Sequence, residues 1–455
     1  MIYVHVPFCR SFCTYCGFYS EAAPKCRRTE DVLSQESRFE EYVSALETEI
    51  RTRQNDIERV FALSGVNTLY IGGGTPSVLS LPMFERLIAV LKEAGHPCRF
   101  DEFTVEVNPE DIVEKGTEFV KGLVALGVNR VSMGVQSFDD DILKWMNRRH
   151  SADQALRAYR ILEEAGVDNI SIDLIFGLSQ MNDELWRETL SKALNISGSG
   201  RPPKHISAYQ LSVEEDSMLE KLIAKGKWSE ASDEVCERQY AILCEVLAEA
   251  GYNHYEISNY AQPGYEAVHN SAYWRHKPYI GLGPGAHSYM VHEDTSILRD
   301  SPVCSDGPLP TELDPTPDSC CRRLLAAKVH RTVCEPLERV GRCHLHISGI
   351  AASVESIRQW NEADLKGYIA AGQTGDFTVV QGSEVLDQEQ LTMEKVMLGL
   401  RTAAGVPEDF LRESCDNALI EDSLKCGNLV KTTDGHIRIP ENRFFISDNI
   451  ISSII

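Results

Sequence analysis

The stretch HVPFCRSFCTYCGFYS, residues 5–20, places three cysteines directly after a short apolar run: Cys9, Cys13 and Cys16. Their spacings are four and three residues, and no fourth cysteine follows within the stretch. A structural zinc site closes a tetrahedron with four protein ligands, and a four-iron cluster has four iron corners to hold. Three thiolates would leave one corner open, where chemistry can occur; a zinc site or unligated thiols are the alternatives.

The composition indicates a folded, soluble protein. The chain has 455 residues, of which 43% are hydrophobic and 25% charged, and this length suggests about two to three domains. The sequence contains no apolar run of roughly 18 residues, the length that a membrane-spanning helix needs. Because the N-terminus MIYVHVPFC lacks a basic region and a long apolar region, it does not resemble a signal peptide, and we expect a cytoplasmic protein.

Charge and cysteine content limit the partners and the redox state. The formal net charge is -23, whereas a protein that binds nucleic acid normally has a basic surface. We therefore expect no nucleic-acid partner. The chain has 14 cysteines, and in a long chain without a signal sequence these favour metal binding and free thiols over disulfides.

Short apolar or alternating runs recur about every 30 residues in the first two thirds of the chain, a rhythm typical of strands that alternate with helices. The intervening stretch SLPMFERLIAVLKEAG and the later EVCERQYAILCEVLAEAG have helical spacing, with Gly95 and Gly251 as expected C-caps. Such units pair in parallel with right-handed crossovers. Six of them predict an α/β fold with an incomplete (β/α)6 TIM-like barrel, and a doubly wound open sheet is the alternative. The expected strands lie within 2–8, 66–73, 103–109, 129–137, 169–177 and 205–213.

Alternation along these strands predicts a polar face near their C-terminal ends, because successive residues of a strand face opposite sides. Active sites of such barrels lie at this mouth, although the same groups could instead face outward or bond to loop backbone. The residues that fall together are Glu106 with Asn108; Ser132 with Gly134 and Gln136; Ser171 with Asp173 and Ile175; and His205 with Ser207 and Tyr209.

The rhythm stops near Met290. A Pro-, Asp- and Ser-rich loop follows, then expected helices at 351–372 and 389–405, and a hairpin around Asp434 and Gly435. We therefore expect a barrel domain over 1–289, a Cys- and His-containing insertion over 290–354, and a C-terminal domain of winged-helix type over 355–455.

Seven motifs together resemble the radical S-adenosylmethionine (SAM) superfamily and, within it, the oxygen-independent coproporphyrinogen III oxidase group. The resemblance covers most of residues 1–289, and it implies a [4Fe–4S] cluster held by Cys9, Cys13 and Cys16, with SAM on the fourth iron. The motifs are YVHVPFCRSFCTYCGFYS, IGGGTPS, VEVNPE, RVSMGVQSFDD, IDLIFGL, YEISNYA and GLGPGAHSY.

The resemblance also implies which residues contact SAM. The assignment of Arg148 as a SAM contact rests on the resemblance alone, and the alternative is an exposed arginine at a helix end. A glycine triplet suits a loop whose backbone approaches a ligand closely, because glycine has no Cβ. The implied SAM contacts are Tyr3, Tyr15, Gly73, Gly74, Thr75, Glu106, Gln136, Arg148 and Asp173.

Two features resemble the heme chaperones of the HemW type more than the oxidase itself. Phe18 stands where the oxidase has a further cysteine, and HNSAYW, from His269 to Trp274, matches a motif linked to heme binding. The resemblance implies that His269 ligates heme and that heme passes to an acceptor hemoprotein. It also allows for a reductant such as flavodoxin or ferredoxin and for peripheral membrane association. The alternative is an enzyme that decarboxylates coproporphyrinogen III oxidatively to protoporphyrinogen IX.

Overall fold

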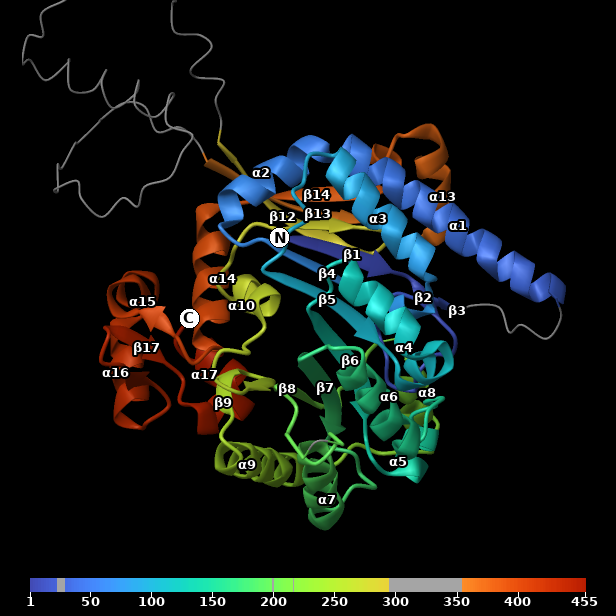
Figure 1. The fold of residues 1–455 in the computed structure, drawn as a ribbon. Coiled ribbons are helices and arrows are strands. Elements are labelled where there is room, and N and C mark those ends of the chain that lie inside the picture. Colours follow the sequence, from blue (N-terminus) through green and yellow to red (C-terminus); the bar gives the residue numbers. More distant parts are fainter. Residues whose placement is uncertain (23–28, 199, 216, 294–353) are drawn as a thin grey trace, which may run out of the picture. The chain divides into compact units, whose positions relative to one another are not determined.

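The computed structural model describes residues 1–22, 29–198, 200–215, 217–293 and 354–455. Six parallel strands lie side by side in chain order and form the centre of a nine-stranded sheet (Figure 1). The six strands are β1 (Ile2–Val6), β4 (Thr68–Gly73), β5 (Glu102–Val107), β6 (Arg130–Gln136), β7 (Asn169–Phe176) and β8 (His205–Gln210). All six expected strands are confirmed.

The sheet is an open, barrel-like sheet rather than a doubly wound one, because its strand order never reverses along the six parallel strands. At one edge, β11 (Ile280–Leu282) pairs in parallel with β1. At the other, β10 (Asn259–Ala261) pairs antiparallel with β8 and with β9 (Asn253–Glu256). The described strands do not close into a ring, as the incomplete barrel predicts.

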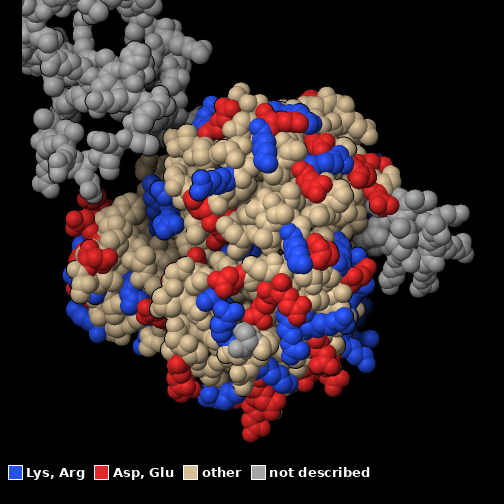
Figure 2. All heavy atoms as spheres, in the orientation of Figure 1, with Lys and Arg blue, Asp and Glu red and all other residues tan. Residues whose placement is uncertain are grey.

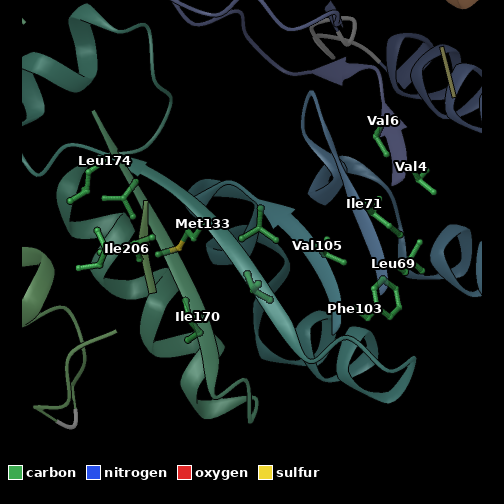
Figure 3. Close-up of a cluster of buried hydrophobic side chains, with 14 of the residues drawn as sticks. Val4, Val6, Leu69, Ile71, Phe103, Val105, Met133, Ile170, Leu174 and Ile206 are labelled. Carbon is green, nitrogen blue, oxygen red and sulfur yellow. The ribbon is translucent and has the colours of Figure 1, made fainter. Parts of the chain in front are cut away.

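One face of the six strands forms the hydrophobic core, which Figure 3 shows in close-up. Alternate residues such as Val4, Leu69 and Val105 are almost fully buried and pack against the helices outside the sheet. The other face carries polar residues, so each strand has one apolar and one polar side.

Helices cover the apolar face and the ends of the sheet (Figure 1). Gly95 and Gly251 follow two of them with φ of 81° and 82°, the left-handed conformation expected for glycine after a helix end. The helices of this region are α1 (Thr29–Thr52), α2 (Gln54–Ser64), α3 (Leu81–Glu93), α4 (Pro109–Ala125), α5 (Asp140–Trp145), α6 (Ala152–Glu164), α7 (Asp183–Leu194), α8 (Met218–Ala224), α9 (Asp233–Glu249) and α10 (Val268–Trp274), with the 3-10 turn η1 (Pro76–Val78).

The residues that follow β11 form two further small sheets. The first has the order β12 (His287–Glu293), β13 (Val354–Asn361) and β14 (Gln381–Leu386), and the second β15 (Val406–Pro407), β17 (His436–Arg438) and β16 (Val430–Lys431). A pair of two-residue strands, β2 (Phe8–Cys9) and β3 (Glu21–Ala22), lies near the N-terminus. The accompanying helices are α13 (Leu365–Thr374), α14 (Gln388–Leu400), α15 (Glu408–Ser414), α16 (Asn417–Lys425) and α17 (Ser447–Ser452), with 3-10 turns η2 (Thr378–Val380) and η3 (Glu441–Ile446).

The helix expected over 351–372 is wrong in its first half. Residues 356–361 pair with β14 as an antiparallel strand, and helix α13 begins only at Leu365. Its N-cap is Asp364, whose carboxylate accepts a hydrogen bond from the Lys366 amide. The hairpin is confirmed, since β16 and β17 pair antiparallel on either side of Asp434 and Gly435.

Residues 1–291 and 356–455 together form one compact unit. The Cys- and His-containing insertion expected over 290–354 lies mostly outside the described residues. On the face shown in Figure 2, acidic and basic side chains are mixed over the coloured surface. None of the helices that the structure describes is long and apolar enough to cross a membrane.

Candidate functional site

The three cysteines of the opening motif line one cavity of about 810 Å³ at the C-terminal ends of the parallel strands. Cys9 ends β2, and Cys13 and Cys16 lie in the loop that follows. The loop is fixed to the end of α5, because Thr14 donates its amide to the Met146 carbonyl at 3.0 Å and its hydroxyl to the Trp145 carbonyl at 2.8 Å. The thiols thus lie on a wall that the protein itself holds in place.

The three thiols are free and line the cavity. All three cysteines are unpaired, and no three Cys, His, Asp or Glu side chains of the described chain converge as ligands for one metal ion. Burial raises the pKa of Cys9, and it raises that of Cys16 to about 11. Binding of iron would therefore displace protons from these sulfurs.

The glycine-rich turn after β4 lies directly against the cluster loop. The amide of Gly74 donates to the Val6 carbonyl at 2.9 Å, and a Cβ on Gly74 would lie 2.7 Å from the carbonyl oxygen of Phe8. Gly73 has a φ of 108°, in the region that favours glycine. Thr75 then places its hydroxyl 3.5 Å from the Cys9 sulfur. Only glycine fits this close approach of β1, β2 and β4.

A chain of hydrogen bonds joins Cys13 to Cys9 through three polar side chains. Arg148 donates to the Cys13 sulfur at 3.4 Å and to the Asn108 side-chain oxygen at 2.7 Å. Asn108 in turn donates to the Thr75 hydroxyl at 3.1 Å. Arg148 also donates to the Gly134 carbonyl at 2.7 Å. It is therefore part of the cavity wall and not an exposed arginine at a helix end.

Two carboxylates line the same cavity. Glu106 accepts hydrogen bonds from the Tyr70 hydroxyl at 2.7 Å and from the Gly73 amide at 3.1 Å. Burial raises the pKa of Glu106 to about 7, and burial also raises the pKa of Asp173. Ser132 donates to Asp173 at 3.2 Å. These two acids can accept hydrogen bonds from polar groups of a ligand.

The remaining implied contacts do not all meet at this cavity. Tyr15 and Gln136 line it, and Gln136 has an unusual φ of 65° at a register shift between β6 and β7. Tyr3 does not line it. Its hydroxyl lies 3.0 Å from the His5 ring, beside a second cavity. The structure thus brings together every implied contact to the cluster and SAM except Tyr3.

The second cavity, of about 400 Å³, adjoins the first: Gly17, Phe18, Tyr70 and Asn270 line both. His269 lies in its wall on α10, but only 1% of the residue is exposed. The two ring nitrogens of His269 lie 2.7 Å from the Thr68 hydroxyl and 2.9 Å from the Tyr273 hydroxyl. A ligand could reach an imidazole nitrogen only if one of these bonds broke.

Several cavity residues were not among the implied contacts. Four of them, Asn108, Ser132, Ser207 and Tyr209, lie on the polar strand faces that alternation predicts, although no motif assigned them a role. The other two, Tyr70 and Arg130, were not indicated by alternation or by any motif.

The residues present fit a [4Fe–4S] cluster with bound SAM. Three free thiols share one cavity wall, and the buried Nε of Arg148 has no hydrogen-bond partner among the described residues. The missing Cβ of Gly74 leaves the backbone open to close approach beside the thiols. Cys9, Cys13 and Cys16 would hold the cluster, and the glycine turn, Glu106 and Asp173 would face SAM.

Comparison with known proteins defines the class. Residues 3–193 match the Radical SAM superfamily. The structure is similar to that described as "Coproporphyrinogen III oxidase (HemN) from Escherichia coli is a Radical SAM enzyme", with a TM-score of 0.66 over 99% of this chain and 89% of that one. That similarity shows the fold alone, since the two chains are 19% identical. Residues 3–193 therefore form a radical SAM domain.

Curated relatives show which family of the radical SAM superfamily the chain belongs to. The "Heme chaperone HemW" of Lactococcus lactis is 34% identical over 289 residues, 64% of this chain and 69% of the relative. That of Bacillus subtilis is 33% identical, over 63% of this chain and 70% of the relative. "Radical S-adenosyl methionine domain-containing protein 1, mitochondrial" of Danio rerio is 31% identical, over 66% and 63%. The chain belongs to the HemW family.

Proposed function

We propose that this protein is a cytoplasmic heme chaperone, which binds heme beside a SAM-chelated [4Fe–4S] cluster and passes it to an acceptor hemoprotein. The observation that carries the proposal is the aromatic second cavity next to the cluster cavity, in a chain of the HemW family. Porphyrins are flat and apolar, and aromatic rings offer them large matching surfaces. A reductant protein such as flavodoxin or ferredoxin is a further partner that we propose.

Phe18 supports the chaperone over the oxidase. Its position resembles that of a further cysteine in the oxidase, and a phenyl ring cannot bind iron. Phe18 is 73% exposed and lines both cavities. An exposed aromatic side chain between the cluster and the second cavity suits contact with a porphyrin face better than it suits redox chemistry.

The cluster cavity has a defined role in this proposal. A bound [4Fe–4S] cluster and SAM together supply reductive cleavage of the sulfonium when an electron is delivered. The chain's own residues position these groups: Arg148 and Thr75 contact cluster cysteines, and Glu106 faces the cavity with a raised pKa.

One experiment separates the chaperone from the oxidase. The full chain is reconstituted with iron and sulfide without oxygen, then titrated with hemin, and separately incubated with coproporphyrinogen III, SAM and dithionite. We expect one heme per chain and no protoporphyrinogen above the background of a cluster-free control. Sustained protoporphyrinogen production would contradict the chaperone and support the oxidase.

A further inference from the structure

The second cavity is built for a flat aromatic ligand. Six aromatic rings line it, from the N-terminal strand, the cluster loop, β4, α10 and the segment before β11: Tyr3, Phe18, Tyr19, Tyr70, Tyr273 and Tyr279. No Cys or Met belongs to the described lining. A heme iron in this cavity would therefore have to find an imidazole or a phenolate as its ligand.

The phenols are poor candidates for that ligand. Tyrosine binds iron as the phenolate, and burial raises the pKa of each of the five tyrosines in the lining, that of Tyr19 to about 12. Four of their hydroxyls also already make hydrogen bonds within the described residues: those of Tyr3, Tyr19, Tyr70 and Tyr273. The lining then offers three imidazoles, those of His5, His269 and His287. The ligand is to be sought among these three.

In two of the three imidazoles, both ring nitrogens already make hydrogen bonds within the protein. His5 has its ring nitrogens 3.0 Å from the Tyr3 hydroxyl and 2.9 Å from the Tyr19 carbonyl, and it is 5% exposed. His269 is occupied in the same way by Thr68 and Tyr273. Neither ring can bind iron without losing a buried hydrogen bond, which would leave a polar group unsatisfied.

His287 differs from both. It is exposed at the edge of the cavity, and no hydrogen bond to its ring is found within the part of the chain that the structure describes. Its ring stacks near Trp360, with centroids 6.2 Å apart and planes at 27°.

The backbone holds His287 firmly in this place. It begins β12, which is joined to the segment before β11 by paired hydrogen bonds between Tyr279 and Tyr289 at 2.8 and 3.0 Å. Its carbonyl packs so closely on Gly281 that a Cβ there would lie 2.0 Å away. A ligand on a fixed strand end is preorganised for an incoming metal.

We propose that His287, and not His269, is the residue that ligates the iron of heme in the second cavity. The inference rests on the proposed function, since it assigns the contact atom within that heme site. His269 then acts by shaping the wall through Tyr273 and Thr68, and exposed His287 is open to a heme that enters or leaves.

The test is a hemin titration of the reconstituted full chain, followed by absorbance and by electron paramagnetic resonance of the ferric heme. We compare the wild type with His287→Ala, His269→Ala and the control His436→Ala, whose histidine lies in the C-terminal hairpin. His287→Ala should weaken heme binding roughly tenfold or more and remove the signal of imidazole-ligated iron, and added imidazole should restore that signal. The control should match the wild type.

The outcomes separate the two proposals. If the wild type binds one heme but His287→Ala keeps the same affinity and spectrum, the ligand assignment is wrong and the chaperone proposal stands. If His269→Ala alone abolishes the imidazole signal while its circular dichroism is unchanged, His269 is the ligand and the assignment to His287 is overturned. If the wild type binds no heme, the proposed function itself fails.

Discussion

Arg148 donates to Asn108, to the Gly134 carbonyl and to the Cys13 sulfur, so one guanidinium contacts three segments of the cavity wall. Asn108 carries the connection on to Thr75 and the Cys9 sulfur. A planar guanidinium with five donors can make such contacts together, which the point charge of a lysine cannot. At the scale of single residues, the spacing of two cluster cysteines thus depends on a side chain that no cysteine motif contains.

We predict that Asn108→Ala loosens the cluster loop. It removes the acceptor for a charged donor, a loss of about 1.5–3 kcal/mol in the free energy of unfolding. Urea unfolding of the cluster-free protein measures that loss, and the rate of iron release to a chelator should rise in the reconstituted protein. The exposed Asn195→Ala is the matched control, and equal behaviour of the two variants would show that Asn108 does not position the loop.

At the scale of elements, the contact between the β4 turn and the β2 strand positions the site. Gly74 packs on the backbone of Phe8, next to Cys9, so a strand end and a turn far apart in sequence fix the first cluster cysteine. Here the packing is of backbone on backbone, which cannot adjust by a change of rotamer.

We predict that Gly74→Ala costs stability and cluster loading together. The added methyl group would meet backbone atoms at 2.7 and 2.9 Å, and such overpacking typically costs about 1–3 kcal/mol. Unfolding in urea and iron content after reconstitution check the two effects. Gly198→Ala, whose Cβ would meet its neighbours at an ordinary 3.5 Å, should change neither, and full iron content in Gly74→Ala would refute the proposed close fit.

Glu256 at the end of β9 makes stability depend on pH. It is 1% exposed, accepts from the Ser258 amide at 3.2 Å and from Asn259, and burial raises its pKa to about 7. Because the folded state holds this proton more tightly than the unfolded state, stability from this group falls as pH rises from about 4.5 to about 7. The shift corresponds to roughly 3 kcal/mol.

We therefore expect Glu256→Gln to lose less stability than the wild type between pH 5 and pH 8. Urea unfolding at both pH values gives the comparison, and the exposed Glu41→Gln serves as the control. An identical pH dependence in Glu256→Gln and the wild type would show that Glu256 is not protonated in the folded protein at pH 5.

The elements show where sequence reasoning succeeds and where it stops. The six strands were predictable because each carries a buried apolar side between turn signals, and alternation placed Glu106, Asn108 and Asp173 on one face. The register shift at Gln136 was not predictable from the sequence, because a bulge depends on the pairing with the neighbouring strand. The strand over 354–361 was mistaken for a helix because its partner, β14, lies 20 residues further on.

At the scale of the whole molecule, buried polar contacts tie the C-terminal segment to the barrel. Glu49 on α1 is fully buried and accepts from Asn361 at 2.8 Å, from Tyr368 at 2.6 Å and from the Gly283 amide at 2.8 Å. Arg53, one turn later, pairs with Glu49 and donates to Gln359 at 2.9 Å. The second cavity is likewise lined by residues far apart in the sequence, from Tyr3 to His287, so no local motif could predict it.

We predict that Glu49→Ala destabilises the whole protein. It removes the fully buried partner of Arg53 and leaves that guanidinium with the partly exposed Asp56 as its one carboxylate partner in the described chain. Breaking a buried pair typically costs about 3–5 kcal/mol in the free energy of unfolding. Denaturant unfolding measures it, with the exposed Glu41→Ala as the control. A loss as small as that of the control would mean that the network does not hold the two regions together.

The three-cysteine cluster with one iron open to SAM is the feature on which the function depends. Mössbauer spectroscopy of the anaerobically reconstituted, 57Fe-enriched chain tests it most directly, with Cys13→Ser and the distant Cys98→Ser in parallel. We predict a [4Fe–4S] cluster in which one iron site changes on addition of SAM, lost in Cys13→Ser and kept in Cys98→Ser. Four irons that SAM leaves unchanged, or a cluster that survives in Cys13→Ser, would contradict it.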